Sequence, residues 1–256
     1  MFKSILAVSQ GGPDAAMAFG LAARVAAQFE GAVDALHLPV GPGAAIGGGF
    51  AMSFEGMPVV AQLDEQRLAE RAAASNSAYD SQLTSAKGST YTAADTYALD
   101  SMVAMGRCSD LLVIGRPGAD QENAAPAIVD AAIYECARPV LVAPPTVGAG
   151  KFASAVVAWN GSFQAARAVN YALPLLRKAD SVTIVVVGSK PEEVAAPYLK
   201  RNLARQGIAA TIEAIDPGAV SGRKRGRALL GFTHDRKADL LVMGAYGRGQ
   251  VMSFLG

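Results

Sequence analysis

Residues 110–118 read DLLVIGRPG, and residues 239–247 read DLLVMGAYG. Each stretch is an apolar run that ends in glycines, a pattern typical of a buried strand followed by a turn. The recurrence of this segment 129 positions later indicates an internal repeat. The chain of 256 residues is therefore expected to hold two copies of one medium-sized domain.

A second repeated segment lies at the start of each copy. The run ILAV at 5–8 leads into the turn Ser9-Gln10-Gly11-Gly12, and AVVA at 155–158 leads into Trp159-Asn160-Gly161-Ser162. The two turns are 150 positions apart. A small-residue helix is predicted after each turn, so both copies begin with a strand, a turn and a helix.

The two offsets locate the main difference in length between the copies. An offset of 150 at the first landmark and 129 at the second makes the second copy 21 residues shorter between them. The extra residues of the first copy are expected in the glycine-rich stretch 41–58. Glycines leave little side-chain surface to pack, so this stretch is predicted to be the least ordered internal segment.

Strands and helices are predicted to alternate throughout. In the first copy the strands lie near 3–8, 32–38, 89–94, 111–115 and 139–143, and the helices near 14–29, 61–86, 96–107 and 125–136. In the second copy the strands lie near 154–159, 181–187, 209–215 and 240–244, and the helices near 163–177, 191–206 and 222–235.

This alternation predicts an α/β fold with two tandem doubly wound parallel-sheet domains, which are Rossmann-like. Continuous apolar strands such as VTIVVV suit a parallel sheet that is buried on both faces. Right-handed strand–helix–strand crossovers then place the first and fourth strands of each copy side by side. The domains are predicted to span 1–146 and 151–256, with the Pro/Gly-rich stretch between them as a linker.

Composition sets the broad class of protein. Apolar residues make up 51% of the chain and the formal net charge is +1, so a globular protein without nucleic-acid or membrane partners is expected. No apolar run approaches the roughly 20 residues of a membrane span. Two cysteines, Cys108 and Cys136, make no disulfide framework, which favours a cytoplasmic protein.

The turns after the first and fourth strands of each copy are the candidate binding elements. In an open parallel sheet, ligands bind at the carboxyl ends of strands where the strand order reverses. In the second copy these turns hold Asn160 and the pair Gly244 and Gly247. Glycines let backbone N–H groups approach an anion, and the Asn160 amide can both donate and accept a hydrogen bond.

The segment DLLVMGAYG at 239–247 and the strand that ends in the turn with Asn160 resemble the universal stress protein family. The likeness runs along nearly the whole chain. ATP-binding members carry the motif Gly-x2-Gly-x9-Gly-Ser/Thr, of which this sequence supplies Gly244 and Gly247; the third glycine falls just past Gly256. In the first copy, Gly115 and Gly118 are followed at the corresponding position by Ile128, so its nucleotide motif is degenerate.

The resemblance implies the adenine nucleotide alpha-hydrolase-like fold, a stress-response role, a homodimer, and ATP or another adenine nucleotide as ligand, with Mg²⁺ accompanying it. The family's Asp is replaced by Asn160, which removes a charge. Carried over position by position, the nucleotide contacts all fall in the second copy: Ala158, Trp159, Asn160, Val187, Met243, Gly244, Tyr246, Gly247 and Arg248.

Three functions follow as alternatives. The first is a regulator without dedicated catalysis, in which a nucleotide bridges the two strand-end turns and biases how domains pair. The second is a dimerisation or interaction scaffold that binds no nucleotide. The third is an enzyme of the same superfamily that hydrolyses ATP or transfers an adenylyl group, although no nucleophile–base pair is recognisable.

Three local features carry competing interpretations. The turn at Gln10 resembles the SGGxDS loop of ATP pyrophosphatases, but Gln10 and Ala15 replace its two serines. Trp159 is interpreted either as a base-stacking residue or as a core residue. The basic run 223–227 is interpreted as a solvated helix start rather than a phosphate contact.

The second copy is predicted to be incomplete at its end. Adding the offset of 129 to Pro144 places the end of a full copy near position 273, which is 17 residues beyond Gly256. The missing part corresponds to a last helix, a fifth strand and half of the phosphate motif. A longer native product, and weak triphosphate binding by this form, are therefore expected.

Overall fold

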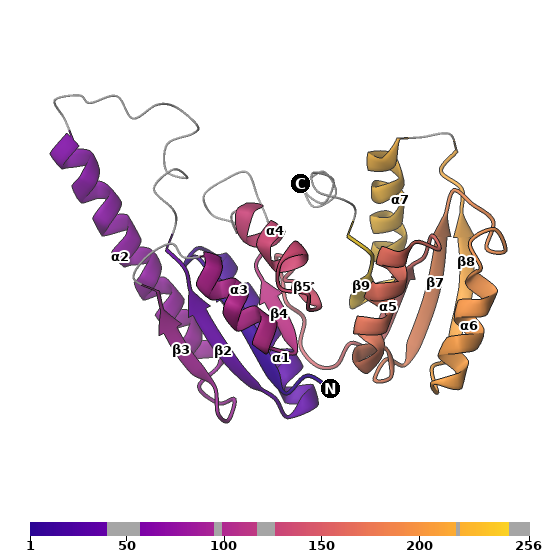
Figure 1. Ribbon diagram of the computed structural model, residues 1–256, viewed down its shortest axis with the longest axis horizontal. Helices are drawn as coiled ribbons and strands as arrows, with labels where there is room; N and C mark the ends of the chain where they lie inside the picture. Colours follow the sequence, from indigo (N-terminus) through magenta and orange to yellow (C-terminus); the bar gives the residue numbers. More distant parts are fainter. Residues whose placement is uncertain (40–56, 95–98, 117–125, 219–220, 246–256) are drawn as a thin grey trace. The chain divides into compact units, whose positions relative to one another are not determined.

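The computed structural model describes residues 1–39, 57–94, 99–116, 126–218 and 221–245. Of residues 57–64 it describes the backbone alone. The chain folds into two compact units. The first comprises the described residues up to Val147, and the second begins at Gly148. Each unit has its own sheet, and each is considered by itself below (Figure 1).

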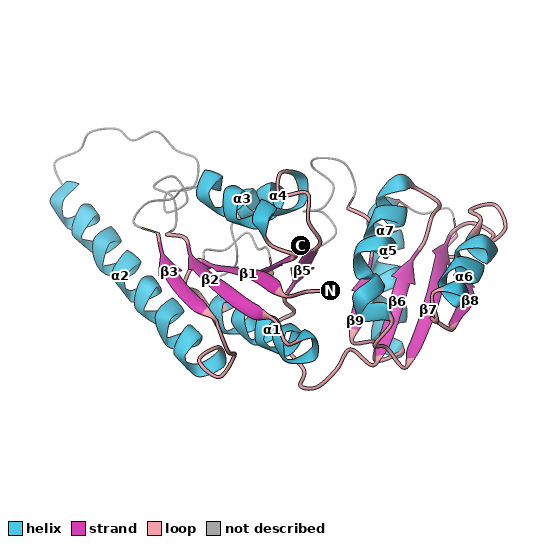
Figure 2. Ribbon diagram, turned by 60° about the horizontal axis from the view of Figure 1, so that its bottom comes forward, coloured by secondary structure: helices cyan, strands magenta, loops and turns pink. Residues whose placement is uncertain are grey.

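The first unit contains a parallel sheet of five strands in the order β3-β2-β1-β4-β5. Its elements, in chain order, are β1 (Ser4–Ser9), α1 (Asp14–Phe29), β2 (Ala32–His37), α2 (Met57–Gln82), β3 (Thr90–Ala93), α3 (Leu99–Cys108), β4 (Leu111–Ile114), α4 (Pro126–Tyr134) and β5 (Val140–Val142). Helices α3 and α4 lie on one face of this sheet and α1 on the other (Figure 2). All four residues of β4 are buried, as expected for a strand with helices on both faces.

The second unit repeats this order in the residues that the structure describes. Its parallel sheet has the strand order β8-β7-β6-β9. Its elements are β6 (Ser154–Ala158), α5 (Phe163–Leu176), β7 (Ser181–Val187), α6 (Ala196–Arg205), β8 (Ala210–Ile215), α7 (Gly222–Asp235) and β9 (Leu240–Val242). Val156 of β6, Val185 of β7 and Leu229 of α7 form a buried apolar cluster that joins this helix to the sheet.

The predicted fold class is confirmed. Strand β1 pairs with both β2 and β4, and β6 pairs with both β7 and β9, always in parallel. The first and fourth strands are therefore adjacent in each sheet, as the doubly wound pattern requires. None of the helices in the described ranges is long and apolar enough to span a bilayer.

An aspartate at the start of the fourth strand joins it to the first strand in both units. Asp110 Oδ2 accepts hydrogen bonds from the backbone N–H groups of Lys3 and Ser4, at 2.8 and 3.0 Å. Asp239 Oδ2 accepts from Ala153 and Ser154 in the same way, at 3.0 Å each. This shared contact explains why both repeated segments begin with Asp.

The predicted helix boundaries differ from the structure at α2 and α6. Helix α2 begins at Met57 rather than near 61 and ends at Gln82 rather than near 86. Helix α6 begins at Ala196 rather than near 191, because Ala195 has a left-handed backbone (φ 57°) that ends the preceding turn. Of the stretch 41–58 predicted to be least ordered, residues up to 56 lie outside the described residues.

Candidate functional site

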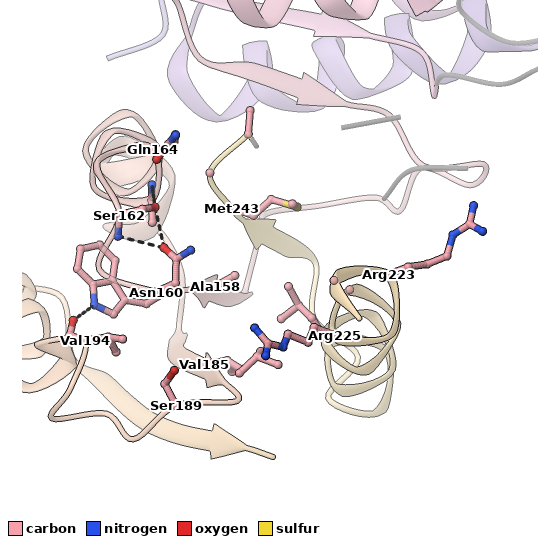
Figure 3. Close-up of a pocket in the computed structure, with 18 residues that line it drawn as sticks. Ala158, Asn160, Ser162, Gln164, Val185, Ser189, Val194, Arg223, Arg225 and Met243 are labelled. Carbon is pink, nitrogen blue, oxygen red and sulfur yellow. Dashed lines mark hydrogen bonds between the residues drawn. The ribbon is translucent and has the colours of Figure 1, made fainter. Parts of the chain in front are cut away.

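A pocket of about 600 Å³ opens at the carboxyl ends of the strands in the second unit. It lies where the strand order reverses between β6 and β9, the place at which open parallel sheets bind ligands. The ends of β6, β7 and β9 contribute to it together with the first turns of α5 and α7 (Figure 3). Its lining residues are Ala158, Trp159, Asn160, Ser162, Gln164, Ala165, Val185, Val187, Ser189, Val194, Gly222, Arg223, Arg225, Gly226, Leu229, Met243, Gly244 and Ala245.

The turn after β6 is held by its own side chains. Asn160 Oδ1 accepts hydrogen bonds from the backbone N–H of Ser162 at 3.1 Å and from its hydroxyl at 2.7 Å. The Ser162 hydroxyl also accepts from the N–H of Ala165 and so caps α5. With both lone pairs of Oδ1 occupied, Asn160 offers a ligand only its Nδ2–H donors, so the expected acceptor role is already taken within the turn.

Trp159 forms part of one wall of the pocket. Its indole Nε1–H donates a 2.6 Å hydrogen bond to the carbonyl oxygen of Val194, and its backbone N–H donates to Val185. The side chain is half-buried and lines the pocket, so it is not a fully enclosed core residue. The indole is thus fixed at the edge of the site, where an aromatic face is available to a ligand.

Gly244 lets the end of β9 approach the start of α5. A Cβ atom at this position would lie 2.7 Å from the backbone nitrogen of Ala165 and 2.8 Å from the Cβ of Gln164. The first unit has the same approach, since a Cβ on Gly115 would lie 2.5 Å from the Cβ of Asp14. A glycine is therefore required at this turn in both units before any ligand is considered.

The pocket brings together six of the nine predicted contact residues. Ala158, Trp159 and Asn160 come from β6 and its turn, Val187 from β7, and Met243 and Gly244 from β9 and its turn. The other three residues, Tyr246, Gly247 and Arg248, lie outside the described residues. The structure thus juxtaposes the two strand-end turns, and a contact of these residues with a nucleotide remains a prediction.

Sequence reasoning missed the contribution of α7. The basic run is exposed at the start of α7, as predicted, and its residues Arg223 and Arg225 also line the pocket. Ser189, two residues beyond the end of β7, was not predicted either. The available signal was topological, because the helix that leads to the fourth strand begins beside the carboxyl ends of the strands in a doubly wound sheet.

In the first unit the backbone N–H groups of the corresponding turn donate to side chains of the same turn and helix. The N–H groups of Gln10 and Gly12 donate to the carboxylate of Asp14, at 3.4 and 3.0 Å. The N–H of Gly11 donates to the Ser9 hydroxyl at 2.9 Å. Amides that would face a phosphate in a pyrophosphate-binding loop are bonded internally, so the partial match to ATP pyrophosphatases lacks its chemistry here.

Helix α2 packs directly over this turn. A Cβ atom on Gly11 would lie 1.9 Å from the backbone carbonyl oxygen of Arg71. The Arg71 Nε donates a 2.8 Å hydrogen bond to the carbonyl oxygen of Gln10. Helix α2 therefore occupies the space in front of the loop, which in the second unit borders the pocket.

Two buried ionisable groups accompany this contact. Burial raises the pKa of Asp14 above its usual 3.8, against the opposing effects of its amide hydrogen bonds and of Arg71. Burial also lowers the pKa of His37 below 6.5, and the positive charge of Arg71 adds to the effect. His37 is therefore neutral near pH 7, in line with a structural role for this histidine.

The described residues do not form a metal centre. Across these ranges, no three His, Cys, Asp or Glu side chains gather as a metal site would require. The described lining of the pocket contains no Asp, Glu, His or Cys. A Mg²⁺ ion accompanying a nucleotide would thus take its ligands from phosphate oxygens and water rather than from these side chains.

One comparison with a known structure supports the fold. No family model matches the chain, and no curated protein matches it. A universal stress protein from Archaeoglobus fulgidus DSM 4304 matches over 93% of this chain and 85% of its own, with a TM-score of 0.57 and 13% identity. Protein Rv1636 from Mycobacterium tuberculosis H37Rv matches over 40% of this chain and 78% of its own, with a TM-score of 0.30 and 22% identity. The chain therefore has the tandem doubly wound α/β fold of a universal stress protein.

Proposed function

We propose that this protein is a universal-stress-protein-type regulator whose second unit binds an adenine nucleotide without dedicated catalysis. The observation that supports the proposal is the pocket of about 600 Å³, which unites the turn after β6 with the turn after β9. Both turns belong to the segments that repeat along the sequence. The pocket is large enough for a small organic ligand.

The chemistry of the lining favours binding over turnover. Apolar side chains such as Val185, Val187 and Leu229 offer contacts to a base, and the Asn160 amide nitrogen offers a donor. In Figure 3 this nitrogen points toward Ala158 and Met243, away from the bonds that the oxygen makes with Ser162. A general base or nucleophile–base pair is not found in the described lining, so occupancy of the site is the proposed signal.

The direct test uses the single tryptophan of the chain. Trp159 lines the pocket, so its fluorescence reports on this site without interference from the first unit. Titration with AMP, ADP and ATP should change this fluorescence saturably. Protein purified without added ligand should also be denatured and its extract searched for adenine compounds by mass spectrometry.

A pair of variants separates pocket binding from surface effects. Val187→Glu places a carboxylate in the pocket at the end of β7 and should weaken nucleotide binding about tenfold or more through charge repulsion and desolvation. Ala214→Glu adds the same charge at an exposed position on the neighbouring strand β8 and should leave binding unchanged. Saturable binding that Val187→Glu does not weaken would place the ligand elsewhere.

Phosphate release from ATP in the presence of Mg²⁺ distinguishes the regulator from an enzyme. We expect release no faster than that of a Val187→Glu control. Turnover that requires the intact pocket would support the catalytic alternative instead, and absence of binding by every adenine nucleotide would favour the scaffold.

A further inference from the structure

The net charge of +1 conceals two units of opposite charge. Residues 148–256 hold 15 Lys and Arg against 7 Asp and Glu, whereas residues 1–147 hold 8 against 15. The second unit therefore has a formal charge of +8 and the first a formal charge of −7. The expectation that the chain has no nucleic-acid partner came from the charge of the whole chain, which averages over the two units.

Helices α5 and α6 lie side by side on one face of the second sheet. Strands β6, β7 and β8 follow one another in the sheet, so right-handed crossovers place both helices on the same face. The Arg177 side chain after the end of α5 donates a 2.6 Å hydrogen bond to the Gln206 side chain after the end of α6. The connection from β8 to β9 runs back across the sheet, which places α7 on the opposite face.

The exposed charges of α5 and α6 are all positive. Neither helix contains an Asp or a Glu. The exposed cations on the two helices and just after α5 are Arg167, Arg177, Lys200, Arg201 and Arg205. In the ranges that the structure describes, none of these five side chains forms an ion pair with a carboxylate. Their positive charge is therefore available to an anionic partner.

An exposed aromatic side chain lies at the start of each of the two helices. Phe163 is the first residue of α5 and is 71% exposed, and Tyr198 in the first turn of α6 is 67% exposed. Both helices begin after strands whose carboxyl ends form one edge of the sheet, so the two rings lie toward the same end. The Arg201 guanidinium lies 4.7 Å from the centroid of the Tyr198 ring, in a cation–π contact.

The aromatic and basic residues recur at helical spacing. Arg167 follows Phe163 by four residues on α5. On α6, Arg201 and Arg205 follow Tyr198 by three and seven residues. Side chains at these spacings share one face of a helix. Each helix therefore presents a stripe that begins with an exposed ring and continues with arginine.

We propose that this exposed surface of α5 and α6 binds single-stranded nucleic acid. The guanidinium groups match the phosphates of a strand, and the two rings offer faces on which unpaired bases stack. The rings favour a single strand over a duplex, whose bases are already stacked, and over an acidic protein, which has no bases. The described pocket lining contains none of the aromatic and basic residues of this surface, so the proposal is independent of nucleotide binding.

The test uses fluorescence anisotropy of labelled probes with the full chain. The probes are oligo(dT) and oligo(U) of about 12 nucleotides and a DNA duplex of the same length. One variant combines Arg201→Gln with Arg205→Gln on α6. The matched control combines Lys224→Gln with Arg227→Gln, which removes the same charge from exposed positions on α7. Circular dichroism checks that the folded content is unchanged.

We expect the α6 variant to bind both single strands about tenfold more weakly than the unmodified protein does. The slope of the logarithm of affinity against that of salt concentration should fall in magnitude by about 1.4, because two phosphate contacts are lost. The α7 control should stay within about twofold of the unmodified protein, since salt screens charges on the far face. Equal weakening in the two variants would overturn the proposal.

The aromatic part of the proposal is tested at Tyr198. Tyr198→Ala should weaken binding of the single strands about fivefold or more, because a stacking face is lost, and should leave duplex binding unchanged. Tyr198→Phe keeps the ring and should bind like the unmodified protein. Equal losses for single strands and duplex in Tyr198→Ala would contradict recognition of unpaired bases.

Two further outcomes would overturn the proposal. Displacement of the probes by excess AMP would place the strand in the pocket rather than on α5 and α6. Absence of binding by both oligonucleotides at low salt would leave a second copy as the occupant, since its first unit has the opposite charge. Light scattering would then show a dimer that the α6 variant dissociates and the α7 control does not.

Discussion

The turns after β1 and β6 are the same structure placed in two different surroundings. Gly11 and Gly161, which are 150 positions apart, both have left-handed backbones with φ values of 75° and 72°. In the first unit helix α2 lies against the turn, and the nearest atom to a Cβ on Gly11 is at 1.9 Å. In the second unit the nearest atom to a Cβ on Gly161 is at 3.3 Å, and the neighbouring Asn160 lines a pocket.

The difference comes from the helix that connects the second and third strands. Helix α2 has 26 residues, whereas its counterpart α6 has 10. The longer helix passes over the turn and brings Arg71 to the carbonyl oxygen of Gln10. One repeated element thus forms a packed core in one unit and borders a binding site in the other, according to the length of a neighbouring helix.

The largest expected effect comes from adding a methyl group to each turn. Gly11→Ala should destabilise the protein by about 3–5 kcal/mol, from the left-handed backbone and from overpacking against α2. Gly161→Ala should cost about 1–2 kcal/mol, because the left-handed backbone is unfavourable and the contact with the Val194 carbonyl oxygen at 3.3 Å needs only a small adjustment. Urea unfolding followed by circular dichroism measures both.

Equal losses of stability in Gly11→Ala and Gly161→Ala would contradict the description of the first turn as packed against α2 and of the second as bordering a pocket. A shift of the Trp159 fluorescence transition in Gly161→Ala, but not in Gly11→Ala, would assign the smaller loss to the second unit.

The second prediction concerns Asp14 and its counterpart Gln164. Asp14→Ala should cost about 3 kcal/mol, because it leaves the amides of Gln10 and Gly12 without their acceptor and Arg71 without its nearby negative charge. Gln164→Ala, at a half-buried position that lines the pocket, should cost less than about 0.5 kcal/mol. Thermal unfolding of both variants provides the comparison.

Asp14→Asn is the matched control for charge, since it keeps an accepting oxygen. The raised pKa of Asp14 means that the folded state binds its proton more tightly than the unfolded state does. Stability of the unmodified protein relative to Asp14→Asn should therefore fall as the pH rises from 3.8 through the folded pKa. If the difference in stability between the two proteins does not change from pH 3.8 upward, Asp14 is not desolvated.

The smallest effect is expected from His37 and depends on pH. Val186 stands at the corresponding position in the second unit, because Leu36 pairs with Val8 as Val185 pairs with Ala158. Because the folded pKa of His37 is lowered below 6.5, the unfolded state binds the proton better at acidic pH. Stability should be complete above pH 6.5 and should decline below it by at most about 1.4 kcal/mol per pH unit.

His37→Val, which copies the second unit, should abolish this part of the pH dependence. Unfolding midpoints of the unmodified protein and of His37→Val at pH 7.5, 6.5 and 5.5 test this prediction. Asp14, the other buried ionisable group beside Arg71, is present in both proteins. If the unfolding midpoint of His37→Val depends on pH as strongly as that of the unmodified protein, His37 titrates normally in the folded protein.

Much of the architecture could be predicted from local patterns. Strand β7 was predicted at 181–187 and lies at Ser181–Val187, because its unbroken β-branched run suits a buried parallel strand. Helix α1 was predicted at 14–29 and lies at Asp14–Phe29, where the Pro-Asp pair starts the helix and alanines pack its buried face. The turns and the equivalence of the two units followed from the spacing of repeated segments alone.

The tertiary structure decided which of the two equivalent turns is open. The reach of α2 over Gly11 depends on packing between segments some 60 residues apart, and the sequence pattern of the turn contains no trace of it. The same holds for Arg225, an exposed residue of the basic run that also lines the pocket. Only the position of α7 beside the end of β7 places this guanidinium over Gly188, because that proximity arises from the winding of the sheet and not from neighbouring residues.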